Sequence, residues 1–322
     1  MKIVYLIQTH KNPEQIYRLV NIIKESSPKS YILISHNPYF CKLDKETFGN
    51  LTNFEIINNQ GGRGDFSLIK GYLDAVHWLF SHNIKFDWLI NLTGQDYPTQ
   101  PLPKIEKFLA ETEYDAFLFH FNALSDCEKN CWGSKEGRDR YLYQYRKLAE
   151  SLPPWQEGLI KFSRRIINNI QPYIRVHTSY GITAGIRANF TPFNEYFACY
   201  GGSYFHTLSL KCIQYLYYFC NQNPELITYY QKTCLPDESF IQTILINSEL
   251  FNICNDNKRY IDFTNSRQGH PRILTVNHYS HLISDEIHFA RKFDMSVDSK
   301  ILDMLDARIL QTIAAKEEGL VR

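Results

Sequence analysis

The feature that most constrains this chain is the alternation of short apolar runs with helical patterns over its first 120 residues. Five runs have the length and composition of buried β-strands, namely residues 2–7, 31–35, 54–58, 88–92 and 116–120. Residues 14–24 and 67–81 instead repeat apolar side chains at the spacing of one helix face. Strands that alternate with helices predict an α/β fold, with a mostly parallel central sheet flanked by helices on both faces.

Polar and glycine residues follow these predicted strands, where the chain turns toward the next element. Ligands of open α/β sheets bind beyond the carboxyl ends of the strands. The residues expected around one crevice are therefore those at the strand ends: Thr9, His10, His36, residues 61–64 and Asp96. The pattern thus predicts a binding site at one edge of the sheet.

The second half of the chain carries weaker patterns. Residues 124–175 are rich in Arg and Lys and poor in strand signals, which predicts loops and helices inserted into the fold. An irregular stretch is expected next, followed by one helix over 208–221 and another after Pro236. A late strand is expected over 259–263, and a helix with a polar face over 299–318.

The composition argues against several classes of protein. The chain has 35 Lys and Arg against 34 Asp and Glu, which leaves no strongly basic surface for nucleic acid. Its 8 cysteines are scattered, as in a cytoplasmic protein with reduced thiols, and their spacing does not indicate a zinc site. Because the sequence shows neither a signal peptide nor an apolar stretch of membrane-spanning length, we expect a cytoplasmic protein that at most lies on the inner membrane face.

The segment around Glu238 carries the best candidate for a catalytic group. Pro236 suits the first turn of a helix, and Phe240, Ile241 and Ile244 continue with helical spacing. Glu238 is therefore expected near a helix start, at the edge of the core. A carboxylate fixed there could act as a general base toward a hydroxyl, or could simply be favoured by the helix dipole.

Several familiar motifs are absent from the sequence. Neither the glycine pattern of dinucleotide-binding folds nor a Walker loop occurs, and Gly-x-Ser-x-Gly is missing as well. No Asp-x-Asp triplet is present to hold a divalent metal on a nucleotide-sugar diphosphate. If the protein is a transferase, cations must neutralise that charge, and Arg259 and Lys292 are candidates, unless they are ordinary surface charges.

Six segments of the chain match a single family in the right order. They are Ile7-Gln-Thr-His-Lys11, Phe66-Ser-Leu-Ile69, Ile90-Asn-Leu-Thr-Gly-Gln-Asp-Tyr-Pro98, Tyr200-Gly-Gly-Ser-Tyr-Phe205, Leu235-Pro-Asp-Glu-Ser-Phe240 and Phe289-Ala-Arg-Lys-Phe-Asp294. Together they resemble the core-2/I-branching enzymes, glycosyltransferase family 14, over about residues 1–300. That family includes the core 2 β-1,6-N-acetylglucosaminyltransferases and the peptide O-xylosyltransferases.

The resemblance implies a glycosyltransferase of the GT-A type, with a single catalytic domain over residues 1–322. A Rossmann-like nucleotide-sugar-binding half would span about 1–122, an acceptor-binding and catalytic half about 123–298, and a C-terminal helix about 299–322. The implied reaction is an inverting transfer of a sugar, GlcNAc or xylose, from a UDP-sugar to a hydroxyl of a glycan or lipid-linked oligosaccharide. The family implies that no metal or other cofactor is required.

Carried over position by position, the resemblance also assigns roles to residues. Glu238 becomes the general base. Donor-binding roles fall to Thr9, His10, Arg63, Asp96, Arg259 and Lys292. Arg259 and Lys292 would be the cations on the diphosphate, with Arg267 or Arg272 as alternatives to Arg259. Acceptor-binding roles fall to Gly202, Ser203 and Tyr204.

The chain also departs from the family pattern. Residues 35–38 read Ser-His-Asn-Pro where a His-x-Asp triplet is common, and Arg63-Gly64 replaces Trp-Gly, so some donor contacts are expected to differ. The stem, anchor and disulfides of animal members are missing, which suggests a bacterial relative that acts on envelope or capsular glycans. Residues 152–170 combine apolar and basic side chains, as expected either of a helix on a membrane surface or of one packed on the core.

Two other functions remain compatible with the sequence. One is a glycan- or nucleotide-sugar-binding protein that has the same fold but no catalytic activity. The other is a metal-dependent GT-A transferase of a different family. Turnover of a UDP-sugar separates the first from an enzyme, and sensitivity to a chelator separates the second from a metal-independent one.

Overall fold

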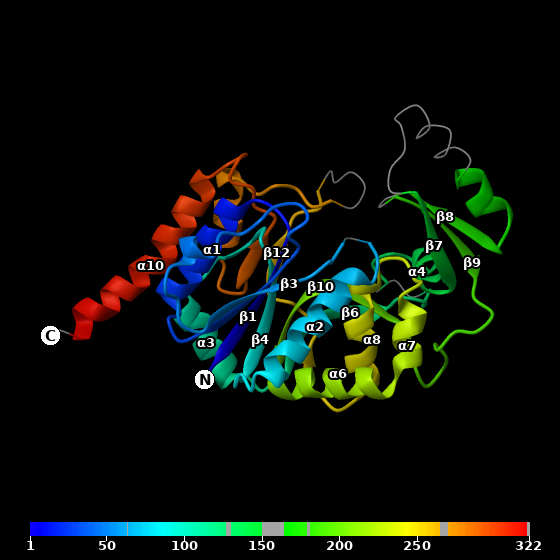
Figure 1. The fold of residues 1–322 in the computed structure, drawn as a ribbon, viewed down its shortest axis with the longest axis horizontal. Helices are drawn as coiled ribbons and strands as arrows, with labels where there is room; N and C mark the ends of the chain where they lie inside the picture. The colour runs from blue at the N-terminus through cyan, green and yellow to red at the C-terminus, as the bar shows by residue number, and fades with distance from the viewer. Residues whose placement is uncertain (63, 127–129, 150–163, 179–180, 265–269, 321–322) are drawn as a thin grey trace.

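The computed structural model describes all residues except 63, 127–129, 150–163, 179–180, 265–269 and 321–322. Its centre is a seven-stranded sheet in the order β11-β6-β10-β4-β1-β2-β3 (Figure 1). The strands are β1 (Ile3–Thr9), β2 (Tyr31–His36), β3 (Phe54–Asn58), β4 (Trp88–Thr93), β6 (Ala116–Asn122), β10 (Tyr200–Ser209) and β11 (Ile253–Cys254). The first four pair in parallel, whereas β10 runs antiparallel to both β4 and β6.

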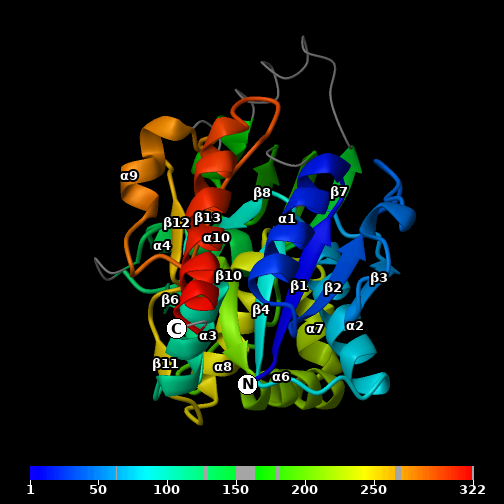
Figure 2. The same cartoon turned by 90° about the vertical axis from the view of Figure 1, so that its left-hand side faces the viewer.

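Helices cover both faces of this sheet, as the apolar runs require (Figure 2). Those packed on one face are α2 (Ser67–Ser81), α6 (Leu210–Gln222), α7 (Pro224–Tyr230) and α8 (Phe240–Asn247). Those packed on the other are α1 (Pro13–Ser26), α3 (Leu102–Glu111) and α10 (Lys300–Leu320). Strand β1 serves both layers, because Leu6 faces the first and Tyr5 the second, and both side chains are fully buried.

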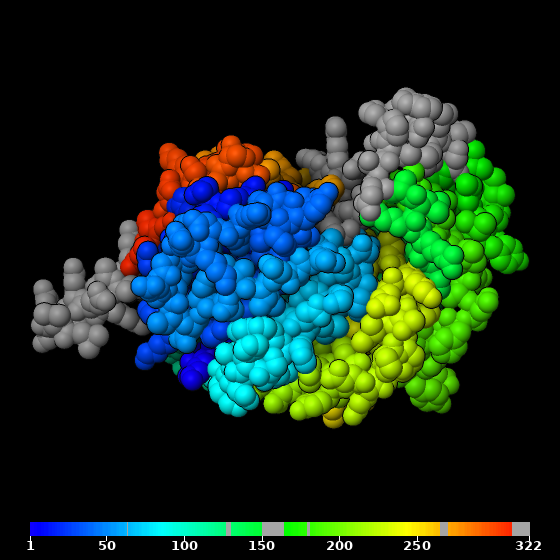
Figure 3. All heavy atoms as spheres, viewed as in Figure 1, coloured from blue at the N-terminus to red at the C-terminus, as the bar shows by residue number. Residues whose placement is uncertain are grey.

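Two smaller sheets complete the fold. The first joins β5 (Asp96–Pro98), β13 (Phe289–Arg291) and β12 (Arg259–Ile261), so it brings two late strands of the chain beside the turn that follows β4. The second is antiparallel and joins β7 (Tyr143–Ala149), β9 (Ile182–Arg187) and β8 (Ile174–His177), preceded by α4 (Ser134–Tyr141). It forms a lobe at the end of the molecule opposite α10 (Figure 3).

The short connecting elements are helical turns. They are the 3-10 helices η1 (Glu46–Phe48), η2 (Pro236–Glu238) and η3 (Val276–His278), and the helix α9 (Tyr279–Leu282). Among the described residues, no helix is long and apolar enough to span a bilayer.

The predicted fold class is confirmed, since the structure is α/β with a large, mostly parallel central sheet flanked by helices. All five predicted strands of the first 120 residues are present, and so are their two helices. The predicted late strand and the C-terminal helix are present as β12 and α10.

Two predictions for the second half are wrong. The stretch expected to be irregular contains β10, a 10-residue strand at the centre of the sheet. Its buried His206 finds partners in the interior: Nδ1 donates to the backbone carbonyl of Tyr204, and Nε2 accepts from the hydroxyl of Tyr72 on α2, at 2.9 Å each. The insertion expected to hold only loops and helices also contains β7 and β8, whose residues are partly polar and half exposed.

Candidate active site

A cavity of about 1030 Å³ opens at the carboxyl ends of β1 and β4, the edge that the strand pattern predicted. Its walls come from parts of the chain that are distant in sequence. They include the ends of β1 and β4, the first half of β10, the turn at 235–238, and the strands β12 and β13 with Lys292. The antiparallel placement of β10 between β4 and β6 is what brings its residues 202–205 to this edge.

Glu238 lies on the wall of this cavity, in the last position of η2. The turn starts at Leu235, whose left-handed φ of 51° is uncommon for a residue other than glycine, and Pro236 follows. The Tyr141 hydroxyl donates to the Leu235 carbonyl at 3.0 Å. The expected continuous helix from Pro236 is thus divided, because Ser239 separates η2 from α8.

A buried polar cluster fixes the point where η2 meets α8. The Ser239 side chain is fully buried, and its Oγ lies 2.9 Å from the Tyr230 hydroxyl and 3.3 Å from Thr243 Oγ1. Thr243 in turn accepts from the backbone N–H of Tyr200 at 3.0 Å, which ties the cluster to β10. Glu238 therefore directly precedes Ser239, a residue that both packing and hydrogen bonds hold in place.

The Glu238 side chain itself is 34% exposed and is held by Arg140. Arg140 Nη1 donates to Glu238 Oε2 at 2.6 Å, and its Nη2 pairs with Glu136. The guanidinium lies 4.2 Å from the centre of the Trp132 ring, which also lines the cavity. The sequence singled out neither Arg140 nor Trp132 as a site residue, because both lie in the insertion, where strand and motif signals are weak.

Arg259 lines the same cavity from the start of β12. Its Nη2 donates to the carbonyls of Asn91 and His206, at 2.9 and 3.1 Å. Its Nε and Nη1 are enclosed and have no partner in the described structure. Burial lowers the pKa of Arg259 to about 10, which leaves the group charged near neutral pH. A buried cation with unused donors suits an anionic ligand.

Arg291 and Lys292 add two further cations at the end of β13. The Arg291 guanidinium lies 4.1 Å from the centre of the Phe205 ring, and its Nε is 3.4 Å from Asp96 Oδ1. The sequence comparison gave the cationic role to Lys292 and passed over Arg291, although both belong to the matched Phe289–Asp294 segment. Their neighbouring positions concentrate positive charge where β12 and β13 meet the cavity.

Asp96 is placed differently from the expectation that it contacts the donor. Its side chain is fully buried and is not part of the cavity wall. Oδ2 accepts from the Thr93 backbone N–H at 2.7 Å and from the Thr93 hydroxyl, while Oδ1 faces Arg291. The carboxylate therefore fixes the turn after β4 and lies beside Arg291, a residue of the cavity wall.

The other expected donor residues divide into three groups. Thr9 and His10 line the cavity, whereas Arg63 and Arg267 lie outside the described residues. Arg272 is absent from the cavity wall and pairs with Asp262 at 3.6 Å, so the structure favours Arg259 over Arg272 beside a ligand.

Thr9 is oriented by the histidine at the end of β2. His36 Nε2 lies 2.7 Å from the Cys41 carbonyl, which can only accept, so this nitrogen carries the proton. His36 Nδ1 then accepts from the Thr9 hydroxyl at 2.8 Å. The oxygen of the Thr9 hydroxyl can thus still accept a hydrogen bond from a ligand in the cavity.

All three expected acceptor residues lie on the cavity wall. A Cβ on Gly202 would come within 1.9 Å of the Phe119 carbonyl oxygen, so only glycine fits there. The Ser203 carbonyl accepts from Gln242 Nε2 at 2.6 Å. The Tyr204 hydroxyl donates to Gln8 Oε1, so within this structure Tyr204 contributes its ring more than its polar end.

The described residues contain no group of three or more His, Cys, Asp or Glu side chains that could hold a metal ion. Most of the segment expected as a basic apolar helix, residues 152–163, lies outside the described residues. Its last part, residues 164–170, is helical.

The family model described as "Core-2/I-Branching enzyme" matches residues 3–287. The chain therefore belongs to this family of glycosyltransferases, the one that its sequence resembles.

Curated relatives agree with the family match. Xylosyltransferase 2 of Rattus norvegicus is 22% identical over 95% of this chain and 33% of its own length, and the Homo sapiens protein gives the same values. Beta-glucuronosyltransferase GlcAT14B of Arabidopsis thaliana is 26% identical over 35% of this chain and 26% of its own length. The chain thus spans about a third of the length of the first curated relatives.

Solved structures resemble the chain only weakly. S. aureus TarS 1-349 in complex with UDP-GlcNAc is 19% identical over 37% of this chain and 34% of its own, with a TM-score of 0.28. A TM-score this low does not establish a shared arrangement of the two chains.

Proposed function

We propose that this protein transfers a sugar from a UDP-sugar to a hydroxyl group of a glycan acceptor, with inversion at the anomeric carbon. One observation carries the proposal: a single cavity contains a carboxylate fixed by an arginine and a separate group of three cations. Glycosyl transfer needs both, a base for the incoming hydroxyl and positive charge for the leaving diphosphate. Membership of the Core-2/I-Branching enzyme family supports the same reaction.

In the proposed mechanism Glu238 is the general base. The acceptor hydroxyl lies between the Glu238 carboxylate and the anomeric carbon, and attacks from the face opposite UDP. As the new bond forms, the proton of the hydroxyl passes to Glu238 and the bond to the diphosphate breaks. The relatives named xylosyltransferase and the family name together make xylose and GlcNAc the first donors to test.

Arg259, Arg291 and Lys292 would stabilise the departing UDP. The diphosphate gains negative charge in the transition state, and cations already fixed in position interact with that charge without reorganising. Arg259 supports this role most directly, because the residue lines the cavity and two of its nitrogens have no hydrogen-bond partner among the described residues. We propose that these cations do the electrostatic work of a metal ion, so that transfer proceeds in excess chelator.

Glu238→Gln tests the assignment of the base. The change keeps the size of the side chain but removes the proton acceptor, so kcat should fall roughly 10²- to 10⁴-fold. UDP affinity, measured by calorimetry, should remain nearly unchanged. Glu225→Gln is the control, since Glu225 is exposed on α7 and is not part of the cavity wall. Activity of Glu238→Gln within a few-fold of the wild type would rule out the proposed base.

Chelator and Lys292→Ala test the cations. Transfer assayed with excess EDTA should match the untreated rate, and Lys292→Ala should weaken UDP binding and slow transfer together. Lys70→Ala, at an exposed lysine that pairs with Asp74, is the control and should change neither. Activity that disappears with EDTA and returns with manganese would show that a metal does this work instead.

A further inference from the structure

Arg140 makes three contacts that together immobilise it beside the proposed base. It donates to Glu238 Oε2 at 2.6 Å, pairs with Glu136 one helical turn earlier, and stacks on Trp132. Its side chain is only 11% exposed, although Glu238 and Glu136 are 34% and 48% exposed. A planar guanidinium packed on an aromatic ring and engaged at both ends has little freedom to move.

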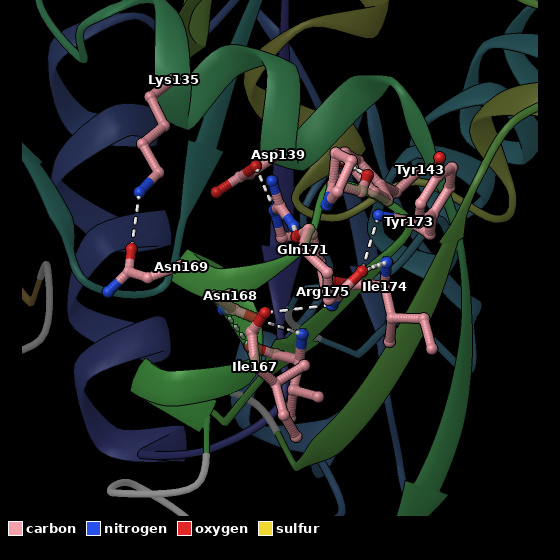
Figure 4. Close-up of polar contacts among 12 residues, drawn as sticks. Lys135, Asp139, Tyr143, Ile167, Asn168, Asn169, Gln171, Tyr173, Ile174 and Arg175 are labelled. Carbon is pink, nitrogen blue, oxygen red and sulfur yellow. Dashed lines mark hydrogen bonds and ion pairs between the residues drawn. The ribbon is translucent and has the colours of Figure 1, made fainter.

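The inserted antiparallel sheet in turn holds the helix that carries Arg140. Arg175 of β8 donates from Nε to Asp139 Oδ1 at 2.6 Å, and both side chains are buried or nearly so (Figure 4). Arg175 Nη1 also donates to the carbonyls of Gln171 and Ile174, at 2.7 and 3.0 Å. Nearer the start of α4, Lys135 donates to Asn169 at 2.9 Å. The residue next to Arg140 is therefore anchored to the sheet.

We propose that Arg140 is a positioning residue, which holds the Glu238 carboxylate in the orientation that accepts the proton, and that the inserted sheet fixes Arg140 through α4. This inference rests on the proposed function. Arg140 engages Oε2, which leaves Oε1 for the acceptor hydroxyl. Without Arg140 the flexible glutamate side chain samples several rotamers, and a displacement of about 1 Å at a reacting group can cost roughly 100-fold in rate.

Kinetics of Arg140→Met test this role. Methionine fills much of the same volume but cannot donate to the carboxylate, so kcat should fall about 10- to 100-fold. The donor KM and the Kd for UDP should stay within twofold, because Arg140 does not contact the cations. Arg140→Lys should retain more activity than Arg140→Met, because a lysine can still donate to the carboxylate. Arg138→Met is the matched control, at an exposed position of the same helix.

Two kinetic outcomes would overturn the proposal. One is a kcat of Arg140→Met within threefold of the wild type. The other is a loss that appears equally in UDP affinity and in the Arg138→Met control, since that pattern belongs to general damage to the fold.

A double-mutant cycle tests the contact without relying on turnover. Urea unfolding is measured for Arg140→Met, Glu238→Gln and the double variant. Side chains in direct contact should be coupled, so the effects of the single changes on the unfolding equilibrium constant should deviate from multiplicative behaviour by at least about threefold. Multiplicative effects would overturn the positioning contact. If the wild type turns over no UDP-sugar, the proposed function fails, while this cycle still decides whether Arg140 holds Glu238.

Discussion

The seven-stranded sheet and the antiparallel sheet β7-β9-β8 are stabilised in different ways. Strand β1 of the large sheet is buried over its whole length and contacts apolar layers on both faces. Strand β7 of the small sheet has buried Tyr143 and Tyr145 but ends in exposed residues, and β8 and β9 are mostly exposed or half-exposed. The small sheet is held by the ion pair and hydrogen bonds of Arg175, whereas the large sheet is held by the packing of apolar side chains.

This difference explains which parts of the chain carry a readable pattern. A strand covered on both faces needs a nearly continuous apolar run, and such a run is visible in one sequence. A small sheet that relies on specific polar pairs needs only the right partners at the right distance. The candidate site uses both kinds of region, because the large sheet supplies the crevice and the insertion supplies Arg140.

The largest expected effect of a change lies in the large sheet. Leu6→Ala removes a fully buried side chain from β1 and leaves a cavity between packed layers. The free energy of unfolding should fall by about 2–5 kcal/mol. Urea denaturation followed by circular dichroism measures it. A loss below about 1 kcal/mol would show that the large sheet is not packed more tightly than the small one.

The next largest effect is expected from the polar centre of the small sheet. Arg175→Met leaves Asp139 without its buried partner, at a cost of about 2–4 kcal/mol in unfolding free energy. If the sheet anchors α4, kcat should fall as well, though less than for Arg140→Met. The exposed Arg187 of β9 provides the control, and Arg187→Met should change neither quantity. An Arg175 variant as stable as the wild type would contradict the idea that polar pairs stabilise this sheet.

A smaller effect depends on pH. Burial, the largest cause, lowers the pKa of His177 in the small sheet to about 4, with Asp139 opposing and Arg140, Arg164 and Arg175 adding to the shift. The unfolded chain binds this proton near pH 6.5, so the stabilisation is complete above that pH and is lost as the pH falls toward 4. At pH 5 the loss attributable to His177 should be about 1–2 kcal/mol.

Unfolding midpoints at pH 7 and pH 5 test this, with His177→Gln as the variant. Removing the titrating group should make the two midpoints more alike. His206 in the large sheet, whose pKa burial lowers to about 3, is the comparison, and His206→Gln should reduce the pH dependence as well. If His177→Gln leaves the pH dependence unchanged, the ring is not held neutral in the folded state.

The smallest effect is expected on the outer face of the small sheet. Ile186 of β9 is 67% exposed and pairs across the sheet with Ile174 and Gln144. Ile186→Ala should change the unfolding free energy by no more than about 0.5 kcal/mol. A loss comparable to that of Leu6→Ala would mean that this face is covered in solution, and would remove the contrast between the two sheets.

Much of the fold and part of the site could be predicted from the sequence. The strands of the first 120 residues, their helices, the position of the binding edge and the family all follow from local patterns and short motifs. Glu238 and Lys292 belong to matched segments, Arg259 was a candidate cation outside them, and all three line one cavity.

Other features depended on contacts between distant segments. Strand β10 lies between β6 and β4, where the backbone N–H of His206 donates to Asn91 Oδ1 and the His206 ring accepts from the Tyr72 hydroxyl. No periodicity in the strand's own sequence reveals these partners. Asp96 lies near a strand end, as expected. Its carboxylate accepts from Thr93 and faces Arg291, and it is not part of the cavity wall.

The sequence by itself determined the layered α/β arrangement and the edge of the sheet where a ligand would bind. Apolar burial is nearly additive along a strand, so a local pattern is enough to specify it. Only the tertiary structure decided which charged side chains form pairs. The pairing of Arg140 with Glu238 joins positions 98 residues apart, and its geometry depends on a helix, an aromatic ring and an inserted sheet together. Such directional contacts require that several segments are in place at once, and no single segment encodes them.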